Sequence, residues 1–435
     1  MRLPAALAAL ALAAASALAG DPTPAELQRE LDALQARLRE LDARQTTLTD
    51  AQVQKTIETV LADAQRRSEL FAVEGFTAGW DNGFVIRSAD GRNSLKPGIL
   101  WQFRHVADWR EGGKSSGDDD LTKGFEIRRT QLFFEGTVCS PNLSYRFMWE
   151  AGKNGGLALQ DAIVSYRFSP NWVFKVGQFF DPVSHELLAG PPRRLAVEPS
   201  VVDFLIGGGQ EDRVQGASII YGGYAKDNPL NVEVAVTDGA KSRNTGWQDV
   251  DSNWGAAARV ESKCFGDWSS YRDFTASANK NDLLVFGAAA DWTDSDNAST
   301  ILATVDAQYE TGKLAMYGAL LGRYIDPRNT ADDDEVFDYG GVAQAAYLFT
   351  QHCEGFLRYS LTEFDNPAPN VSDSIHEICV GANYYVVPTA PHRCKITVDV
   401  TYLPNGAPAS LNGFGIAGGT EEDEIVVRAQ VQLLI

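Results

Sequence analysis

The feature that most constrains this chain is a two-residue alternation of apolar and polar side chains. In segment 99–109, Ile99, Trp101 and Trp109 fall on one face, whereas Arg104 and Asp108 fall on the other. The last twelve residues repeat this alternation. A period of two is typical of β-strands, because successive side chains of a strand point to opposite faces. The alternation therefore predicts strands with one apolar face and one polar face.

Alternating runs recur from about residue 95 to the last residue. About sixteen can be counted, and most are close to the ~10 residues that a tilted strand needs to cross a bilayer. The expected strands are 95–109, 124–138, 143–152, 158–168, 172–180, 213–224, 229–238, 252–264, 282–294, 298–310, 313–325, 336–349, 353–364, 374–387, 393–403 and 424–435. No apolar stretch long enough for a membrane-spanning helix follows the N-terminal residues.

The links between these runs alternate in length. Tight turns are expected at 139–142, 169–171 and 311–313. The long links are 110–123, 181–212, 239–251, 326–335, 365–373 and 404–423. Link 265–281 is the exception, because it is long but falls on the short-turn side. Short turns at one end and long loops at the other predict an all-β, antiparallel transmembrane barrel of about sixteen strands over residues 75–435.

The polar face carries many long cationic side chains. They are Arg104, Arg129, Arg146, Arg167, Lys175, Arg259, Arg358 and Arg428. A soluble sandwich buries one face and exposes the other to water. A barrel with a lipid-facing belt and a water-filled lumen accommodates both faces and leaves no open edge.

The N-terminal part follows a different pattern. The Leu/Ala run that starts at Leu3 and the tripeptide Ala17-Leu18-Ala19 predict a signal peptide over 1–19. Leucines then recur in steps of three and four through segment 20–74, which predicts an α-helical coiled coil. They are Leu27, Leu31, Leu34, Leu38, Leu41 and Leu48. The alternative is a single amphipathic helix lying on the rest of the protein.

Charge and cysteine content limit the partners. The net charge of −20 argues against nucleic acid, which needs a basic face. No CxxC motif supports a structural zinc site, and no cofactor is implied. Four of the five cysteines are expected at the short-turn rim and one in the middle of a strand. The rim cysteines could form disulfides such as Cys353–Cys394, or the cysteines could be small buried side chains. They are Cys139, Cys264, Cys353, Cys394 and, mid-strand, Cys379.

Several motifs after residue 79 resemble the phosphate-selective porin O and P family. They include Trp80-Asp81-Asn82-Gly83-Phe84 and Phe125-Glu126-Ile127-Arg128-Arg129. The best match runs from Leu159-Gln160-Asp161-Ala162 to Ser169-Pro170-Asn171, then Val176-Gly177-Gln178-Phe179. The resemblance implies an outer-membrane porin whose third loop folds into the barrel, with an N-terminal coil as in some relatives.

In this arrangement, link 181–212 is expected to fold into the barrel and form the narrowest part of the pore. Its Pro191-Pro192-Arg193-Arg194 segment can present two guanidinium groups, which bind phosphate oxygens through paired hydrogen bonds. The candidate anion-binding residues are Arg193, Arg194, Arg104, Arg129, Arg146, Arg167 and Lys175. In the alternative, Arg193 and Arg194 pair with Glu186 or Glu198 and only brace the loop.

Acidic residues oppose an all-basic pathway. Asp108, Glu135, Glu150, Asp161 and Glu261 are expected on the same lumen face. Acidic runs in the outer loops indicate solvated tips, or sites for divalent cations. They are Asp118–Asp120, Asp332–Glu335 and Glu421–Glu424.

We therefore expect an outer-membrane porin, a homotrimer surrounded by outer-membrane lipid, that passes small solutes or inorganic anions. One alternative is a general or cation-leaning porin that also contacts the cell wall through 24–70. An outer-membrane enzyme would need a nucleophile beside a base, and the five scattered histidines and the missing GxSxG motif suggest none.

Overall fold

The computed structural model describes residues 28–29, 31–37, 39, 76–111, 120–152, 155–208, 212–249, 252–276, 281–328, 334–367, 371–419 and 422–435. The chain divides into two compact units, 1–75 and 76–435. In the first unit the described residues are helical, and Leu31 and Leu34 are exposed. The predicted signal peptide and the other leucines of the seam lie outside the described residues. Among the described residues, no helix has the length and apolar character needed to cross a membrane.

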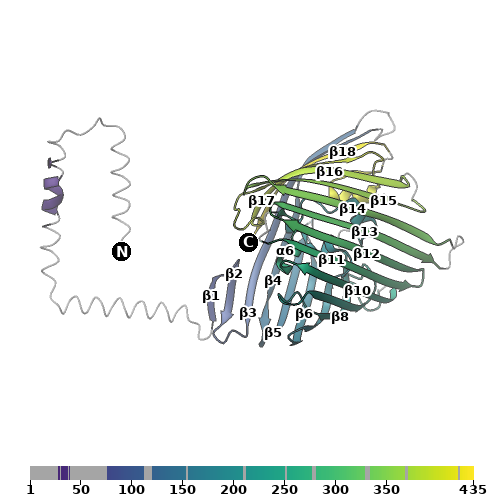
Figure 1. The fold of residues 1–435 in the computed structure, drawn as a ribbon, viewed down its shortest axis with the longest axis horizontal. Helices are drawn as coiled ribbons and strands as arrows, with labels where there is room; N and C mark the ends of the chain where they lie inside the picture. Colours follow the sequence, from purple (N-terminus) through teal and green to yellow (C-terminus); the bar gives the residue numbers. More distant parts are fainter. Residues whose placement is uncertain are drawn as a thin grey trace. The chain divides into compact units, whose positions relative to one another are not determined.

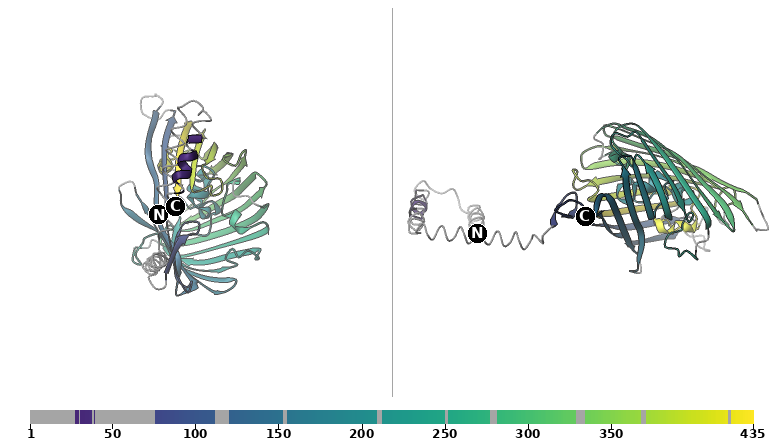
Figure 2. Two further views of the ribbon diagram at one scale, coloured as in Figure 1. Left: turned by 90° about the vertical axis from the view of Figure 1, so that its left-hand side faces the viewer. Right: turned by 90° about the horizontal axis from the view of Figure 1, so that it is seen from below.

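The second unit is a closed antiparallel barrel (Figures 1 and 2). Each strand pairs with the next along the chain, and the last pairs with the first from Glu424↔Arg110 to Leu434↔Leu100. The barrel strands are β3 (Ser94–Arg110), β4 (Asp120–Val138), β5 (Ser140–Ala151), β6 (Leu157–Ser169), β7 (Trp172–Phe180), β8 (Arg213–Tyr221), β9 (Leu230–Thr237), β10 (Ser252–Phe265), β11 (Leu283–Ser295), β12 (Ala298–Thr311), β13 (Leu314–Pro327), β14 (Val336–Leu348), β15 (Cys353–Glu363), β16 (Ser374–Tyr385), β17 (Cys394–Leu403) and β18 (Glu424–Leu434). The prediction of a barrel of about sixteen antiparallel strands is confirmed.

A hairpin that the alternation did not predict precedes the barrel. It consists of β1 (Phe76–Trp80) and β2 (Phe84–Ser88), and β2 pairs with the start of β3 through Ile86↔Leu95. Each strand has only five residues, which is too few for a period-two pattern to stand out in the sequence. The hairpin therefore extends the sheet beyond the end of β18.

The two faces of the barrel wall follow the predicted alternation. On β3, Arg104 and Asp108 are buried inside the barrel, whereas Trp109 is exposed on the outside. A β-bulge in β4 interrupts the strict period, because Gln102 pairs with Arg129 and the next residue, Phe103, pairs with Ile127. The extra residue is Arg128, so two consecutive arginines reach the interior.

Long links fold into the barrel and fill part of it. Link 181–212 carries α4 (His185–Ala189), the 3₁₀ turn η1 (Pro191–Arg193) and α5 (Val201–Ile206). Link 404–423 carries η3 (Ala409–Phe414). Link 265–281, long as predicted, carries α6 (Trp268–Tyr271) and enters from the short-turn side.

An apolar core inside the barrel holds link 181–212, which we call the inward loop. Val202 and Ile206 of α5 pack with Ala315, Tyr317 and Leu321, which project inward from β13. A second cluster joins Val201 to η3 and to neighbouring inner-wall side chains. The lumen is therefore partly filled by packed apolar side chains. The apolar stretch of this link, α5, is therefore covered by side chains of the inner wall.

The five cysteines form no disulfide. Cys139, Cys264 and Cys353 are exposed, Cys394 is half-buried and Cys379 is buried. The Cys353–Cys394 pairing is therefore wrong, because one strand separates β15 from β17. The alternative of small buried side chains holds for Cys379 but is wrong for the three exposed cysteines.

One buried carboxylate fixes the inward loop to the barrel wall. Glu198 is fully buried and contacts Arg104 at 2.7 Å, Arg129 at 3.0 Å and also Arg128. Burial alone would raise the pKa of Glu198, but Arg128, Arg129 and Arg104 hold it well below its usual range. Because these arginines come from β3 and β4, their pairing with Glu198 ties the loop to that wall.

Replacing this carboxylate should release the loop and leave the barrel closed. Glu198→Gln leaves three buried arginines without their shared anion, at a cost of about 3–5 kcal/mol. We expect trypsin to cut the purified variant after Arg193 or Arg194, where the wild type resists. Glu335→Gln, an exposed outer-loop change, is the control. Equal resistance of Glu198→Gln and wild type would contradict this role.

Candidate pore site

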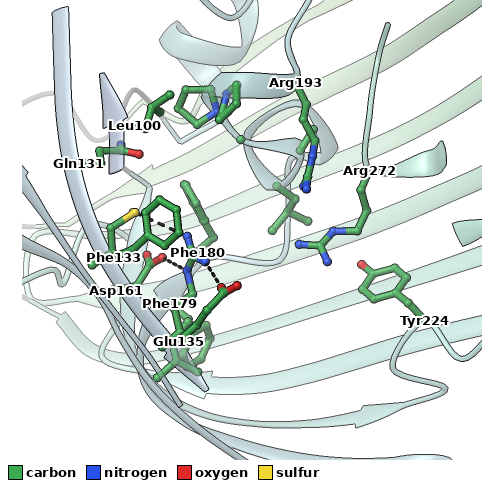
Figure 3. Close-up of a pocket in the computed structure, with 18 of the residues that line it drawn as sticks. Leu100, Gln131, Phe133, Glu135, Asp161, Phe179, Phe180, Arg193, Tyr224 and Arg272 are labelled. Carbon is green, nitrogen blue, oxygen red and sulfur yellow. Dashed lines mark hydrogen bonds and ion pairs between the residues drawn. The ribbon is translucent and has the colours of Figure 1, made fainter. Parts of the chain in front are cut away.

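A cavity of about 650 Å³ lies inside the barrel, on the short-turn side of the inward loop (Figure 3). One wall comes from β3–β8, with Phe133, Glu135 and Asp161 among its side chains. The opposite wall comes from η1 and from the residue after α6, and carries Arg193 and Arg272. Two of the inward-folded links therefore share one cavity with the barrel wall.

The cavity lining is strongly basic. Eight lysine or arginine side chains and three carboxylates line it. The cations are Lys96, Arg146, Lys175, Arg193, Arg213, Arg259, Arg272 and Arg393, and the acids are Glu135, Asp161 and Glu233. The excess of positive charge arises although the whole chain carries a net charge of −20. The formal charge of the cavity lining therefore has the opposite sign to that of the whole chain.

Several of these cations are neutralised by the nearby acids. Arg146 contacts Glu135 at 2.8 Å and Asp161 at 2.9 Å. Arg213 contacts the other oxygen of Asp161 at 2.8 Å. Lys175 pairs in the same way with Glu233 at 2.5 Å. These side chains help to hold the wall and are not free to bind an incoming anion with their full charge.

Four of the lining cations, Lys96, Arg393, Arg193 and Arg272, form no ion pair with a carboxylate of the described residues, and the wall opposite β3–β8 carries two of them, Arg193 and Arg272. Both side chains are open to the cavity, and both point into it (Figure 3). Enclosure within the barrel lowers the pKa of Arg193, and the nearby Arg272 cation lowers it further. Two uncompensated cations in an enclosed space favour an anion between them.

The two segments that carry these arginines are held together. The Phe274 amide donates to the Arg193 carbonyl at 3.2 Å. His185 of α4 stacks on Tyr271 of α6, with ring centroids 3.8 Å apart. The Tyr271 hydroxyl accepts a hydrogen bond from Arg259 on β10 at 2.9 Å. The backbone positions of Arg193 and Arg272 relative to each other are therefore fixed by packing.

Of the seven predicted site residues, three line the cavity: Arg146, Lys175 and Arg193. Arg104 and Arg129 lie instead in the buried network around Glu198. Arg167 donates to the Pro170 carbonyl in the β6–β7 turn. The anion-binding role of these residues stays a prediction.

Arg194 does not line the cavity. Its side chain is buried, and burial lowers its pKa to about 10. Its carbonyl accepts a hydrogen bond from Lys395 at 2.8 Å. Adjacent residues therefore have different surroundings, with Arg193 open to the cavity and Arg194 packed behind it.

Sequence reasoning missed Arg272 as a site residue. It also missed Arg213, whose guanidinium lies over the Phe180 ring. A signal for Arg272 was present, because link 265–281 was the one long link on the short-turn side. Nothing in the local pattern indicated that this link would fold inward beside η1.

Three acidic residues lie close together where the inward loop joins the barrel wall. Asp181 and Asp212 flank the loop, and Asp291 on β11 lies near them, all three buried. Burial, reinforced by the neighbouring Asp291, raises the pKa of Asp212 to about 7. Within the described ranges, no three acidic, histidine or cysteine side chains are arranged to hold a metal ion.

The closed sixteen-stranded barrel, with a charged lumen narrowed by an inward loop, defines an outer-membrane porin. The model of the family "Phosphate-selective porin O and P" matches residues 102–398. The chain belongs to this family, which confirms the resemblance seen in its motifs.

Solved porins share the fold at low sequence identity. Salmonella typhi OmpF, in complex with daunomycin, is 14% identical, with a TM-score of 0.53 over 82% of this chain and 100% of that chain. The outer-membrane channel DcaP of Acinetobacter baumannii is 13% identical, with a TM-score of 0.52 over 81% and 99%. OprB of Pseudomonas putida is 8% identical, with a TM-score of 0.52 over 78% and 94%. No curated protein matches the sequence.

The raised pKa of Asp212 predicts a pH-dependent stability. Because the pKa in the folded state lies above the ordinary value of 3.8, ionisation opposes folding. The stabilisation is complete below about pH 4 and is lost as the pH rises through about 7, by on the order of 4 kcal/mol.

Asp212→Asn should remove this loss. We expect its melting temperature in detergent to match the wild type at about pH 4 and to exceed it at pH 8. Asp238→Asn, at an exposed position, is the control. An identical pH dependence of Asp212→Asn and wild type would rule out Asp212 as the cause.

Proposed function

We propose that this porin is a passive channel for small hydrophilic solutes and that it favours anions, inorganic phosphate among them. The observation that carries the proposal is the pair of uncompensated cations, Arg193 and Arg272, facing one enclosed cavity. Arginine forks donate paired hydrogen bonds to the oxygens of phosphate and carboxylate. Rings of arginine and lysine give anion pores, whereas rings of acids give cation pores.

A general or cation-leaning porin is the alternative. It is favoured by Glu135, Asp161 and Glu233, the three carboxylates that line the same cavity. The sign of the ion selectivity distinguishes the two proposals, because each group of charges would impose its own sign on the current.

We also propose that residues 1–19 direct export and that the apolar outer face contacts outer-membrane lipid. Exposed side chains such as Phe286, Leu320 and Val380 supply this face. A coiled coil within 20–74 would join three chains and contact the cell wall through 24–70. It is supported by exposed Leu31 and Leu34, which lie on a helix at the spacing of a seam.

Removing the free cations should change ion selectivity. We expect Arg193→Ala and Arg272→Ala each to lower the chloride-to-potassium permeability ratio about threefold, because each removes one uncompensated charge from an enclosed site. The reversal potential of the purified protein in a planar bilayer under a KCl gradient measures this ratio.

Arg167→Ala is the matched control, because this arginine lies near the end of β6, outside the cavity, and donates to the Pro170 carbonyl. Added phosphate should reduce the wild-type current and have less effect on the two variants. A cation-selective wild-type current, or unchanged selectivity in both variants, would refute the proposal.

Deleting residues 24–70 distinguishes the role of the barrel as a channel from the role of the coiled coil in trimer formation and cell-wall contact. We expect unit conductance to stay the same, because the barrel strands begin at Ser94. Cells with the deletion should leak periplasmic enzyme, and the purified protein should run as a monomer in native electrophoresis. An intact envelope and unchanged trimers would contradict the role of the coil.

A further inference from the structure

The wall that faces Arg193 and Arg272 carries aromatic and apolar side chains beside its ion-paired residues. Phe133 and Phe180 lie across the cavity from Arg193 and Arg272 (Figure 3). Leu100 and Ile163 continue this wall. Two arginines without a carboxylate partner among the described residues therefore face a wall in which aromatic rings lie beside ion-paired side chains.

The aromatic wall is held in place by the cations that are already neutralised. The Arg146 guanidinium lies 5.3 Å from the Phe133 ring centroid, and Arg213 lies 3.9 Å from that of Phe180. Both arginines contact Asp161, which fixes their positions. Cation–π contacts of this kind favour one ring orientation. The rings are therefore positioned before any solute arrives.

This arrangement suits an organic anion better than a small inorganic ion. Phosphate needs hydrogen-bond donors around its whole surface, because an oxygen turned to an apolar wall loses its hydration without compensation. The rings, Leu100 and Ile163 offer no such donors. A cavity of about 650 Å³ also falls in the range of sites for organic ligands, which combine apolar walls with a few placed polar groups.

We propose that the preferred solute is an organic carboxylate with a flat apolar body. Its carboxylate binds Arg193 and Arg272, and its body packs on Phe133 and Phe180. The inference rests on the proposed anion preference and deepens it, because the same cations serve both. It adds a second determinant, the aromatic wall, which an inorganic anion does not use.

The test compares four probes on the full-length protein in planar bilayers. Benzoate has both charge and ring, acetate lacks the ring, phosphate has charge alone, and benzyl alcohol has the ring alone. We expect benzoate to block the current at about tenfold lower concentration than acetate or phosphate, and benzyl alcohol not to block. Equal block by the three anions would overturn the inference and leave the anion preference standing.

Two further outcomes also overturn it. Block by benzyl alcohol as strong as by benzoate would show that the ring partitions without help from the arginines. A cation-selective current that no probe blocks would refute the proposed function itself, and the aromatic site with it. The probes therefore separate failure of the substrate class from failure of the anion preference.

One variant on each wall of the cavity tests which residues bind the ring of the solute and which bind its carboxylate. Phe133→Ser should weaken benzoate block about tenfold and change phosphate block less than twofold, whereas Arg193→Gln should weaken both. Should the serine variant fail to assemble, Phe133→Leu should weaken benzoate block about threefold. Phe125→Ser is the control, because Phe125 lies on the same strand with its ring exposed on the outside. Unchanged benzoate block in both Phe133 variants would overturn the inference.

Discussion

The structure depends on the pairing of Glu198 with three arginines. A carboxylate at this depth is tolerated only when opposite charges and hydrogen bonds compensate for its lost hydration. Arg104, Arg128 and Arg129 supply them, and the β4 bulge brings two consecutive arginines to the same carboxylate. With this contact the inward loop has one position, and the cavity beside it has a defined shape.

Cations in this barrel have two distinct roles that only their partners distinguish. Those close to carboxylates build the wall, as Arg146 and Arg213 do around Asp161. Arg193 and Arg272, which have no such partner among the described residues, lie on inward-folded links and add positive charge to the cavity. Ion selectivity in such a pore depends on the number of cations that lack a carboxylate partner, and the total number of arginines says little about it.

Much of the barrel could be predicted from local alternation, because the period of two reports which face each side chain takes. Strands such as β7 and β12 were predicted to within a residue of their observed bounds. The alternation cannot report which charges meet across the lumen, so Arg104 and Arg129 were grouped with Arg193 as pore residues. Their pairing with Glu198 depends on contacts between residues 69 to 94 positions apart. The β1–β2 hairpin was missed because its strands are short.

The contacts of the inward loop also have a consequence for how the barrel forms. The Val197 amide donates to Asp399 on β17, and the Val201 amide donates to Glu377 on β16. Glu198 meets β3 and β4, so the loop contacts both ends of the strand sequence. Contacts this distant along the chain form late, because closing long loops costs entropy before the contacts repay it. The loop therefore reaches its final position only after β16 and β17 have been added to the sheet.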